Sequence, residues 1–279
     1  MKCAAIRCRL PGSTRWVIPI ATLLSCATAA MSAEIRVEGE AQKFSVSSIG
    51  ARPLVGAGAD VDNSLKLDGL GPAFRVGLTL GASRRLELRY RRLEDENPYA
   101  TAVPDLVLNG EQRAQSSTID LLLMQRLGHS PFRLEAGYRH FAVDRYWQDA
   151  VSAGHDQYTL DSASNVTGDG LRVAIGLDLR FLKVLHLDAG LGHSFLFGHE
   201  DTHSVWNGPD ELSTTSLTID EGHNLGLDEL HLDLRCDVGP RAWLAVGYRY
   251  DVWQGSGDDA GEFSAGGMTF AVGFRLGGS

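Results

Sequence analysis

The residues of this chain that most resemble a reactive centre form the segment GHEDTH at 198–203. His199, Glu200 and His203 have the H-E-x-x-H spacing by which an α-helix presents two zinc-binding imidazoles and a general base. Here the motif follows a predicted β-strand, and no helical period continues after it. In an extended chain Glu200 faces away from the two histidines. We therefore expect a chance match in a polar loop, and no zinc site.

Two other pairs have the residue types of a catalytic centre, His193 with Ser194 and His155 with Asp156. Adjacent residues of a strand point to opposite faces, so His193 cannot activate Ser194. The second pair is a loop dipeptide without an identifiable nucleophile. We expect no enzymatic activity, no catalytic residue and no cofactor.

A third chemical feature is the acidic character of two predicted loops, 199–224 and 254–263. The first loop contains no Lys or Arg. Carboxylates of this density predict weak binding of divalent cations, which prefer oxygen ligands. The acids concerned are Glu200, Asp201, Asp210, Glu211, Asp220, Glu221, Asp258, Asp259 and Glu262.

The elements that position these residues follow a period of two, which is typical of strands with two chemically different faces. In GLRVAIGLDLRF, 170–181, Leu and Ile side chains alternate with Arg, Asp, Gly and Ala. The same pattern predicts nine strands, and a tenth is expected at 42–50, with an eight-stranded barrel as the alternative. The nine cover 74–80, 85–91, 119–126, 132–141, 170–181, 185–197, 230–238, 244–252 and 268–276.

The connections between these strands are of two kinds. Four are tight, at 81–84, 128–131, 182–183 and 239–241, whereas those at 94–115, 144–168, 199–224 and 254–263 are long and polar. Short turns at one end and long loops at the other are typical of transmembrane β-barrels. Aromatic residues near the strand ends predict two interfacial girdles. Their members are Phe132, Phe181, Trp243 and Phe274 at one end, and Tyr90, Phe195, Phe197, Tyr250 and Trp253 at the other.

The N-terminal residues predict export through a signal peptide covering 1–33, because four basic residues precede an uncharged run that ends in small residues. Cleavage is expected after Ala33, with Ala29 or Ala30 as alternatives, and Cys26 in LLSC is an alternative lipidation site. Only Cys236 then remains, so no intrachain disulfide can form. Loss of the leader shifts the formal net charge from −9 to −13, which argues against nucleic acid as a partner.

The strand sequences resemble those of the pore-forming outer-membrane proteins typified by the Legionella major outer membrane protein. The likeness covers residues 72–276 and rests on segments such as GPAFRVGLTLGASRRLELRYRRLE, FRLEAGYRHFAVD and LAVGYRYDVWQG. It implies an outer-membrane pore without cofactor or catalytic residues. The expected organisation is a leader at 1–33, an N-terminal segment at 34–71 that contains the strand at 42–50, and a barrel at 72–279.

If the apolar face of each strand meets lipid, the other face lines a lumen of mixed charge. A barrel of eight to ten strands is only wide enough for its own side chains, so opposite charges are expected to pair across strands. One interpretation is a packed ion-pair network, and the other is a narrow channel whose arginines select anions. The predicted lining residues are Arg75, Glu87, Arg89, Arg91, Asp120, Arg133, Glu135, Arg139, Arg172, Asp178, Arg180, Asp188, Asp233, Arg235, Arg249, Asp251 and Arg275.

The sequence therefore predicts an all-β, transmembrane, antiparallel up-and-down barrel in the outer membrane, surrounded by lipid and lipopolysaccharide. The expected function is a narrow porin-like pore or a structural surface protein. Two alternatives remain open: a barrel enzyme with its site at the extracellular rim, and a soluble periplasmic β-barrel that binds a ligand, with the apolar face turned inward.

Overall fold

Ten antiparallel strands close into one barrel, in which β1 pairs with both β2 and β10. The computed structural model describes residues 33–47, 65–103, 106–153, 156–208, 215–255 and 262–276. Most of the predicted leader, with Cys26, lies outside these residues. The strands are β1 (Ala33–Ser47), β2 (Leu65–Leu80), β3 (Arg84–Val103), β4 (Leu106–Arg126), β5 (Phe132–Ala153), β6 (Asp156–Arg180), β7 (Leu185–Asn207), β8 (Thr215–Asp237), β9 (Ala242–Gly255) and β10 (Glu262–Leu276).

The predicted orientation of the two strand faces is confirmed. Large apolar side chains lie on the outside, where Leu171, Leu191 and Phe270 are 52%, 59% and 58% exposed, while arginines and carboxylates of the opposite parity are buried inside. An apolar exterior around a charged interior is the surface of a transmembrane barrel and not of a soluble one. Among the described residues, no helix has the length and apolarity to span a membrane.

Tight turns join the strands at one end of the barrel, which we call the turn end. They lie at 81–83, 127–131, 181–184 and 238–241, as the sequence predicts. Gly81 and Gly128 have φ angles of 76° and 60°, in the left-handed region that glycine adopts without steric cost. The pair Ala33 and Leu276 also lies at this end, so the first and last described residues are neighbours there.

The predicted long loops are mostly strands, which corrects the sequence-based prediction. β3 and β4 pair up to Val103 and Leu106, and β5 and β6 pair up to Ala153 and Asp156. The segment 94–115 therefore forms a β-hairpin, as does 144–168. Over much of these hairpins neither face of a strand is consistently apolar, so the alternation that marks a strand in sequence disappears although the pairing continues.

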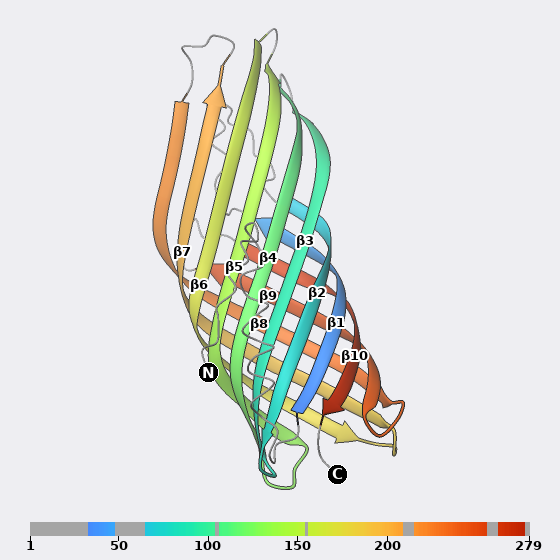
Figure 1. Cartoon of the computed structure of the whole chain (residues 1–279). Coiled ribbons are helices and arrows are strands. Elements are labelled where there is room, and N and C mark those ends of the chain that lie inside the picture. Colours follow the sequence, from blue (N-terminus) through green and yellow to red (C-terminus); the bar gives the residue numbers. More distant parts are fainter. Residues whose placement is uncertain are drawn as a thin grey trace, which may run out of the picture.

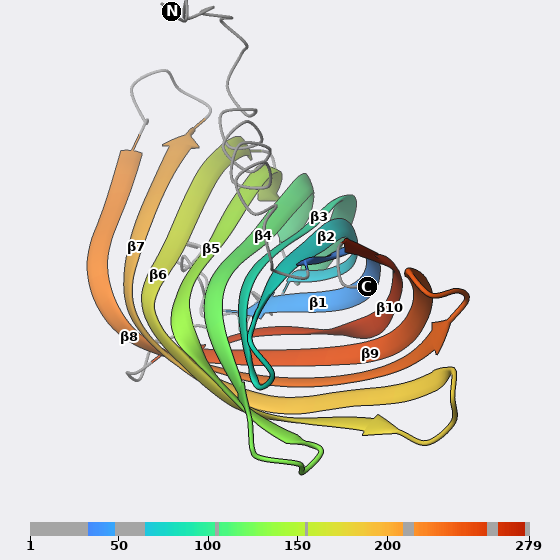
Figure 2. The ribbon, with the colours of Figure 1, turned by 60° about the horizontal axis from the view of Figure 1, so that its bottom comes forward.

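Together with the paired upper parts of β7 and β8, these hairpins form a six-stranded sheet that extends beyond the rest of the barrel, at what we call the hairpin end (Figure 1). The pairing of β2 with β3 ends at Leu70 and Glu94, and that of β8 with β9 ends at Leu225 and Gly255. The upper parts of β3 to β8 then continue without β9, β10, β1 and β2. Figure 2 shows the resulting barrel, with one side of its wall longer than the other. We call this extension the hairpin sheet.

The first strand lies at Ala33–Ser47, earlier than the range of 42–50 expected from the sequence, and β2 begins at Leu65 instead of near residue 74. Residues 48–50 are not among the described residues. Ile35 and Val37 alternate with Arg36 and Glu38, so the period of two is present in this segment. The strand was not predicted there because the segment directly follows the expected cleavage site.

The predicted positions of the girdle residues are confirmed except for two tryptophans. Phe132, Phe181 and Phe274 are exposed on the outer face near the turn end, and Phe195, Phe197 and Tyr250 near the other boundary of the belt. Trp243 and Trp253 are instead buried inside the barrel, 1% and 2% exposed. Both have the parity of Arg249 and Asp251, which face inward, so their place in the alternation requires this position.

Candidate functional site in the barrel lumen

Most of the predicted lining residues lie inside the barrel, but their burial differs along its axis. Arg133, Asp188, Arg235, Arg249 and Arg275 are partly exposed, whereas Asp178 and Arg180 are exposed at the turn end. The fully buried group is Arg75, Glu87, Arg89, Arg91, Asp120, Glu135, Arg139, Arg172, Asp233 and Asp251.

Arg172, on β6, is the most enclosed of these side chains, with an exposure of 0%. Its Nη1 donates to Glu135 Oε2 over 2.9 Å, and its Nε donates to Glu229 Oε1 over 2.8 Å. Arg139, on β5, holds Asp120 through two hydrogen bonds of 2.6 and 2.7 Å. Each guanidinium therefore meets carboxylates from neighbouring or opposing strands, an arrangement that offsets the cost of burying both charges.

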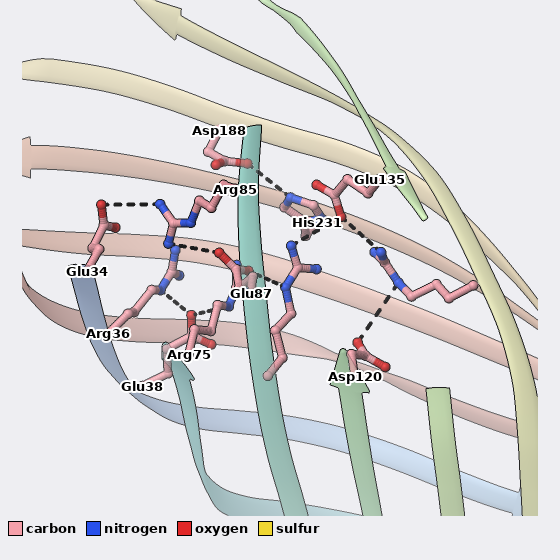
Figure 3. Close-up of polar contacts among 12 residues, drawn as sticks. Glu34, Arg36, Glu38, Arg75, Arg85, Glu87, Asp120, Glu135, Asp188 and His231 are labelled. Carbon is pink, nitrogen blue, oxygen red and sulfur yellow. Dashed lines mark hydrogen bonds and ion pairs between the residues drawn. The ribbon is translucent and has the colours of Figure 1, made fainter. Parts of the chain in front are cut away.

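A second group of buried charges involves β1, β2 and β8. Arg36 Nη2 donates to Asp233 Oδ2 over 2.8 Å, and Glu38 lies 3.0 Å from Arg75 Nε. In Figure 3, Arg85 contacts Glu34 and Glu87, while Glu38 lies between Arg36 and Arg75. We call the charged side chains of both groups, together with the pair Arg91 and Asp251, the ionic layer. It comprises Arg36, Glu38, Arg75, Glu87, Arg89, Arg91, Asp120, Glu135, Arg139, Arg172, Glu229, Asp233 and Asp251.

Three members of the ionic layer were missed in the sequence. Arg36 and Glu38 lie on the part of β1 that was assigned to the region before the first strand, and Glu229 lies one residue before the predicted start of its strand at 230. The signal for all three is the parity of the strand. Glu229 has the parity of His231 and Asp233, so extending the alternation by two residues identifies it.

Glycines provide the space that these long side chains occupy. A Cβ atom at Gly176 would lie 2.6 Å from Arg133 Cζ, and one at Gly190 would lie 2.3 Å from His231 Cε1. Such distances are far shorter than a normal contact, so even alanine requires the neighbouring side chain to move. The expectation that small residues on the inner face reflect a crowded lumen thus has a direct structural basis.

Above the ionic layer, towards the hairpin end, the inner face becomes apolar. Phe141 contacts Phe263 and Trp253 with ring centroids 5.7 and 6.2 Å apart. The contributing side chains come from β3 to β10 and are at most 3% exposed. We call this cluster the apolar layer. It comprises Leu93, Ala114, Phe141, Val143, Val166, Leu196, Leu225, Leu227, Trp253, Phe263 and Ala265.

Short polar side chains follow the apolar layer on the inner face of the hairpin sheet. Thr202 donates to Ser164 over 2.9 Å, and the hydroxyl groups of Ser162 and Ser204 are hydrogen-bonded to each other. All four residues are at most 4% exposed. Hydroxyl groups paired across neighbouring strands stabilise a sheet without long side chains.

The larger of two cavities formed by the described residues of the lumen lies at the turn end. A cavity of about 310 Å³ there is lined by residues that include Thr79, Arg126 and Arg133. Within the ionic layer only about 30 Å³ remains, beside Thr118 and Asp120. That is room for about one water molecule, since a single water needs at least ~10–15 Å³ of such space.

The candidate catalytic residues on β7 point alternately to the two faces of the strand. His199, Glu200 and His203 all lie on β7, so Glu200 faces inward and the two exposed histidines face outward, as the alternation predicts. Ser194 is buried and accepts a hydrogen bond from Arg139 over 3.1 Å, while His193 on the outer face contacts Asp228 over 2.6 Å. No group of His, Cys, Asp or Glu within the described part of the chain has the arrangement of a metal site.

No protein-family model matches the sequence, and no curated protein matches it either. Among solved structures, the outer-membrane protease OmpT from Escherichia coli superimposes with a TM-score of 0.52 and 8% sequence identity, covering 90% of this chain and 97% of that one. The translocator domain of the autotransporter NalP from Neisseria meningitidis gives a TM-score of 0.43 at 10% identity, covering 92% of each chain. The P. putida toluene transporter TodX gives 0.35 at 8%, covering 91% of this chain and 92% of that one.

The likeness to OmpT shows that this chain has the fold of an outer-membrane β-barrel protein. At 8% identity it shows the fold alone. The resemblance to the Legionella-type pore-forming family finds no support among these structures and stays a prediction.

Proposed function

We propose that the protein is a structural surface protein of the outer membrane, a barrel whose lumen is closed and whose hairpin sheet is presented to the outside of the cell. The observation that carries this proposal is the apolar layer, which lies directly on the ionic layer. A pore requires a continuous path of water, and both layers oppose such a path.

The apolar layer opposes it because an ion entering it would lose its hydration shell without gaining a polar partner. Such a transfer costs tens of kcal/mol in the idealised limit, and hydrophobic constrictions close pores by excluding water. Eight of the ten strands contribute side chains to the layer. Closure is therefore a property of most of the wall, and not of one side chain that could rotate aside.

The ionic layer adds a second obstruction of different chemistry. An anion-selective channel would need guanidinium groups that are available to a passing solute. Arg139 and Arg172 are instead occupied by Asp120, Glu135 and Glu229. This favours the packed ion-pair network over the channel. The channel is the interpretation that the likeness to pore-forming proteins implies.

Placement in the outer membrane is supported by the apolar belt, the fold and the predicted leader. Lipid and lipopolysaccharide are then the natural surroundings of the belt, and the acidic residues of the hairpin end are candidates to bind divalent cations held there. In the usual orientation of such barrels the tight turns lie in the periplasm and the hairpin sheet outside the cell. We assign the protein no catalytic activity, since Ser194 faces the lumen and His193 faces outward, while His155 lies outside the described residues.

Single-channel recording in a planar bilayer tests the closed lumen. The purified, folded protein is expected to produce no reproducible conductance steps in concentrated potassium chloride. Insertion must be verified in parallel, by showing that the same preparation is incorporated into lipid vesicles in its heat-modifiable, folded form. Steady steps of uniform size from a verified preparation would overturn the proposal in favour of a pore.

A further inference from the structure

A hollow on the outer face of the hairpin sheet has the composition of a small-molecule site. It has a volume of about 400 Å³ and lies across β4, β5, β6 and β7. Its outward-facing residues form two adjacent rows in the strand register. One row is Arg113, Tyr146, Ala163 and His203, and the other is Gln115, Asp144, Asn165 and Asp201.

The first row explains why the surface is hollowed. Ala163 on β6 lies directly between Tyr146 on β5 and His203 on β7. Neighbouring strands are about 4.8 Å apart, so the two ring-bearing residues are separated by about 10 Å with only a methyl group between them. The result is a slot with ring-bearing residues on both sides, and the side chain of Tyr146 is 45% exposed.

The second row supplies hydrogen-bonding groups along one side of the slot. Asn165 donates from Nδ2 to Asp144, and Asp144 and Asp201 are both exposed. Gln115 accepts a hydrogen bond from Arg92 over 2.8 Å, which leaves its own amide N–H groups directed elsewhere. This row therefore contains carboxylate acceptors and amide donors, and the guanidinium of Arg113 lies at the neighbouring position in the first row.

The hollow lies in the aqueous region and not at the lipid. Tyr138 is the last outward residue of β5 that continues the apolar belt, and Tyr146 follows eight residues later on the same strand. At about 3.4 Å per residue this is about 27 Å along the strand. A water-soluble ligand therefore reaches the hollow without competition from acyl chains.

We propose that this hollow binds a pyranose sugar. A pyranose ring has an apolar face of C–H groups and a rim of hydroxyl groups, and an aromatic wall beside planar polar side chains complements both. Tyr146 and His203 would contact the ring faces. Asp144 and Asp201 would accept hydrogen bonds from the hydroxyl groups, and Asn165 and Arg113 would donate to them.

The inference gives the proposed surface role a ligand class, and it rests on that proposal only for its biological meaning. The hollow is on the outside of the wall, whereas closure concerns the inside. Loss of sugar binding would leave the conductance result unchanged, and an open pore would leave the hollow unchanged. The two proposals can therefore fail separately.

Saturation-transfer NMR tests the proposal on the folded barrel in a detergent without a sugar headgroup. The probes are the methyl pyranosides of glucose, galactose and mannose, each at up to about 10 mM. At least one is expected to receive saturation from the protein. Ala163→Val, which fills the floor of the slot with a strand-compatible side chain, is expected to weaken binding at least tenfold, and so is Tyr146→Ala.

Ala150→Val is the matched control, because Ala150 is exposed on the same face of β5 but does not line the hollow. It is expected to bind the probe as the parent does. Absence of binding by the parent for all three glycosides overturns the proposal. Equal binding by the parent and by folded Tyr146→Ala and Ala163→Val overturns it as well, because binding then occurs elsewhere.

Discussion

The ionic layer and the apolar layer fill the same lumen with opposite chemistry. In the ionic layer, each buried charge is tolerated because an opposite charge meets it, as Arg172 meets Glu135 and Glu229. In the apolar layer, Phe141 and its neighbours need no particular partner, because apolar burial is roughly proportional to area. The first layer is therefore specific and sensitive to single changes, and the second is more tolerant.

The same strands carry both layers, so the difference lies in the sequence and not in the backbone. β5 presents Glu135 and Arg139 to the lumen and then Phe141 and Val143, without a break in the alternation. Parity decides which residues face inward, and residue type decides which layer they join. We expect the layers to respond differently to substitution, and the following predictions are ordered from the largest effect to the smallest.

Removing one charge from the ionic layer is expected to be the most damaging change. Arg172→Leu leaves Glu135 and Glu229 buried without their shared partner, and breaking a buried ion pair in this way costs about 3–5 kcal/mol. The free energy of unfolding in urea, followed by tryptophan fluorescence in detergent, gives the measurement. Arg180→Leu, at the exposed end of the same strand, should stay within about 0.5 kcal/mol. A loss below about 1 kcal/mol for Arg172→Leu would show that the network is not needed for stability.

The apolar layer should lose less from the removal of one side chain. Leu227 is 0% exposed and lies directly opposite Trp253 in the register. Leu227→Ala is expected to cost about 2–3 kcal/mol, the lower part of the range for buried leucines, because the large neighbouring rings can close part of the cavity. The same urea titration compares it with Leu232→Ala on the lipid face. If Leu227→Ala costs more than Arg172→Leu, the proposed ranking of the two layers is wrong.

The close fit within the lumen can be tested by adding a single methyl group. Gly176→Ala places a Cβ atom 2.6 Å from Arg133 Cζ, so Arg133 must shift away from its hydrogen bonds to Asp188. We expect a loss of about 1–2 kcal/mol, within the usual range for overpacking. Gly226→Ala is the control, because its nearest neighbour would be 3.5 Å away. Equal thermal midpoints for the two variants would show that Arg133 can move away from the added methyl group without loss of stability.

An exposed ion pair on the hairpin sheet is expected to make the smallest contribution to the free energy of unfolding. The hydrogen bond from Arg113, with a second one from Arg92, lowers the pKa of Glu94, which lies beyond the lipid-facing belt. Because the folded-state pKa is the lower one, the stabilisation is complete above the ordinary pKa of glutamate, about 4.3, and is lost as the pH falls through the folded-state value. Its size should be a few tenths of a kcal/mol, as for other exposed pairs.

Thermal midpoints of the parent and Glu94→Gln at neutral pH and at about pH 3 measure this contribution. The parent should be slightly more stable at neutral pH, and the difference should become smaller in acid. A difference that grows on acidification would contradict the assignment of the charged form as the stabilised one.

The alternation predicts much of the fold, because one-sided burial makes strand register visible in sequence. It places Leu171, Val173 and Ile175 outside and Arg172 inside, and the tight turns at Gly81 and Gly128 follow from it. It fails on the hairpin sheet, where neither face is apolar and pairing is decided by backbone hydrogen bonds alone. No contrast in hydropathy then separates a strand from a loop.

For the lumen, the inward positions are predictable but their partners are not. Parity places Arg139 and Asp251 inside, yet the contact of Arg172 with Glu135 on β5 and Glu229 on β8 depends on how the barrel closes. In the apolar layer, Trp253 was misplaced because its position near a strand end was taken as the membrane boundary. Trp253 shares the parity of Asp251, and applying parity first would have placed it inside.

Thiol accessibility tests the sealed lumen most directly. In a Cys236→Ser background, single cysteines replace Thr79, which lines the cavity at the turn end, and Val166, which is 1% exposed in the apolar layer. A small charged methanethiosulfonate should modify Thr79→Cys rapidly in the folded protein, and Val166→Cys only after unfolding in urea. Modification of folded Val166→Cys at a rate close to that of Thr79→Cys would show that water and ions reach the apolar layer, and the lumen would then not be closed.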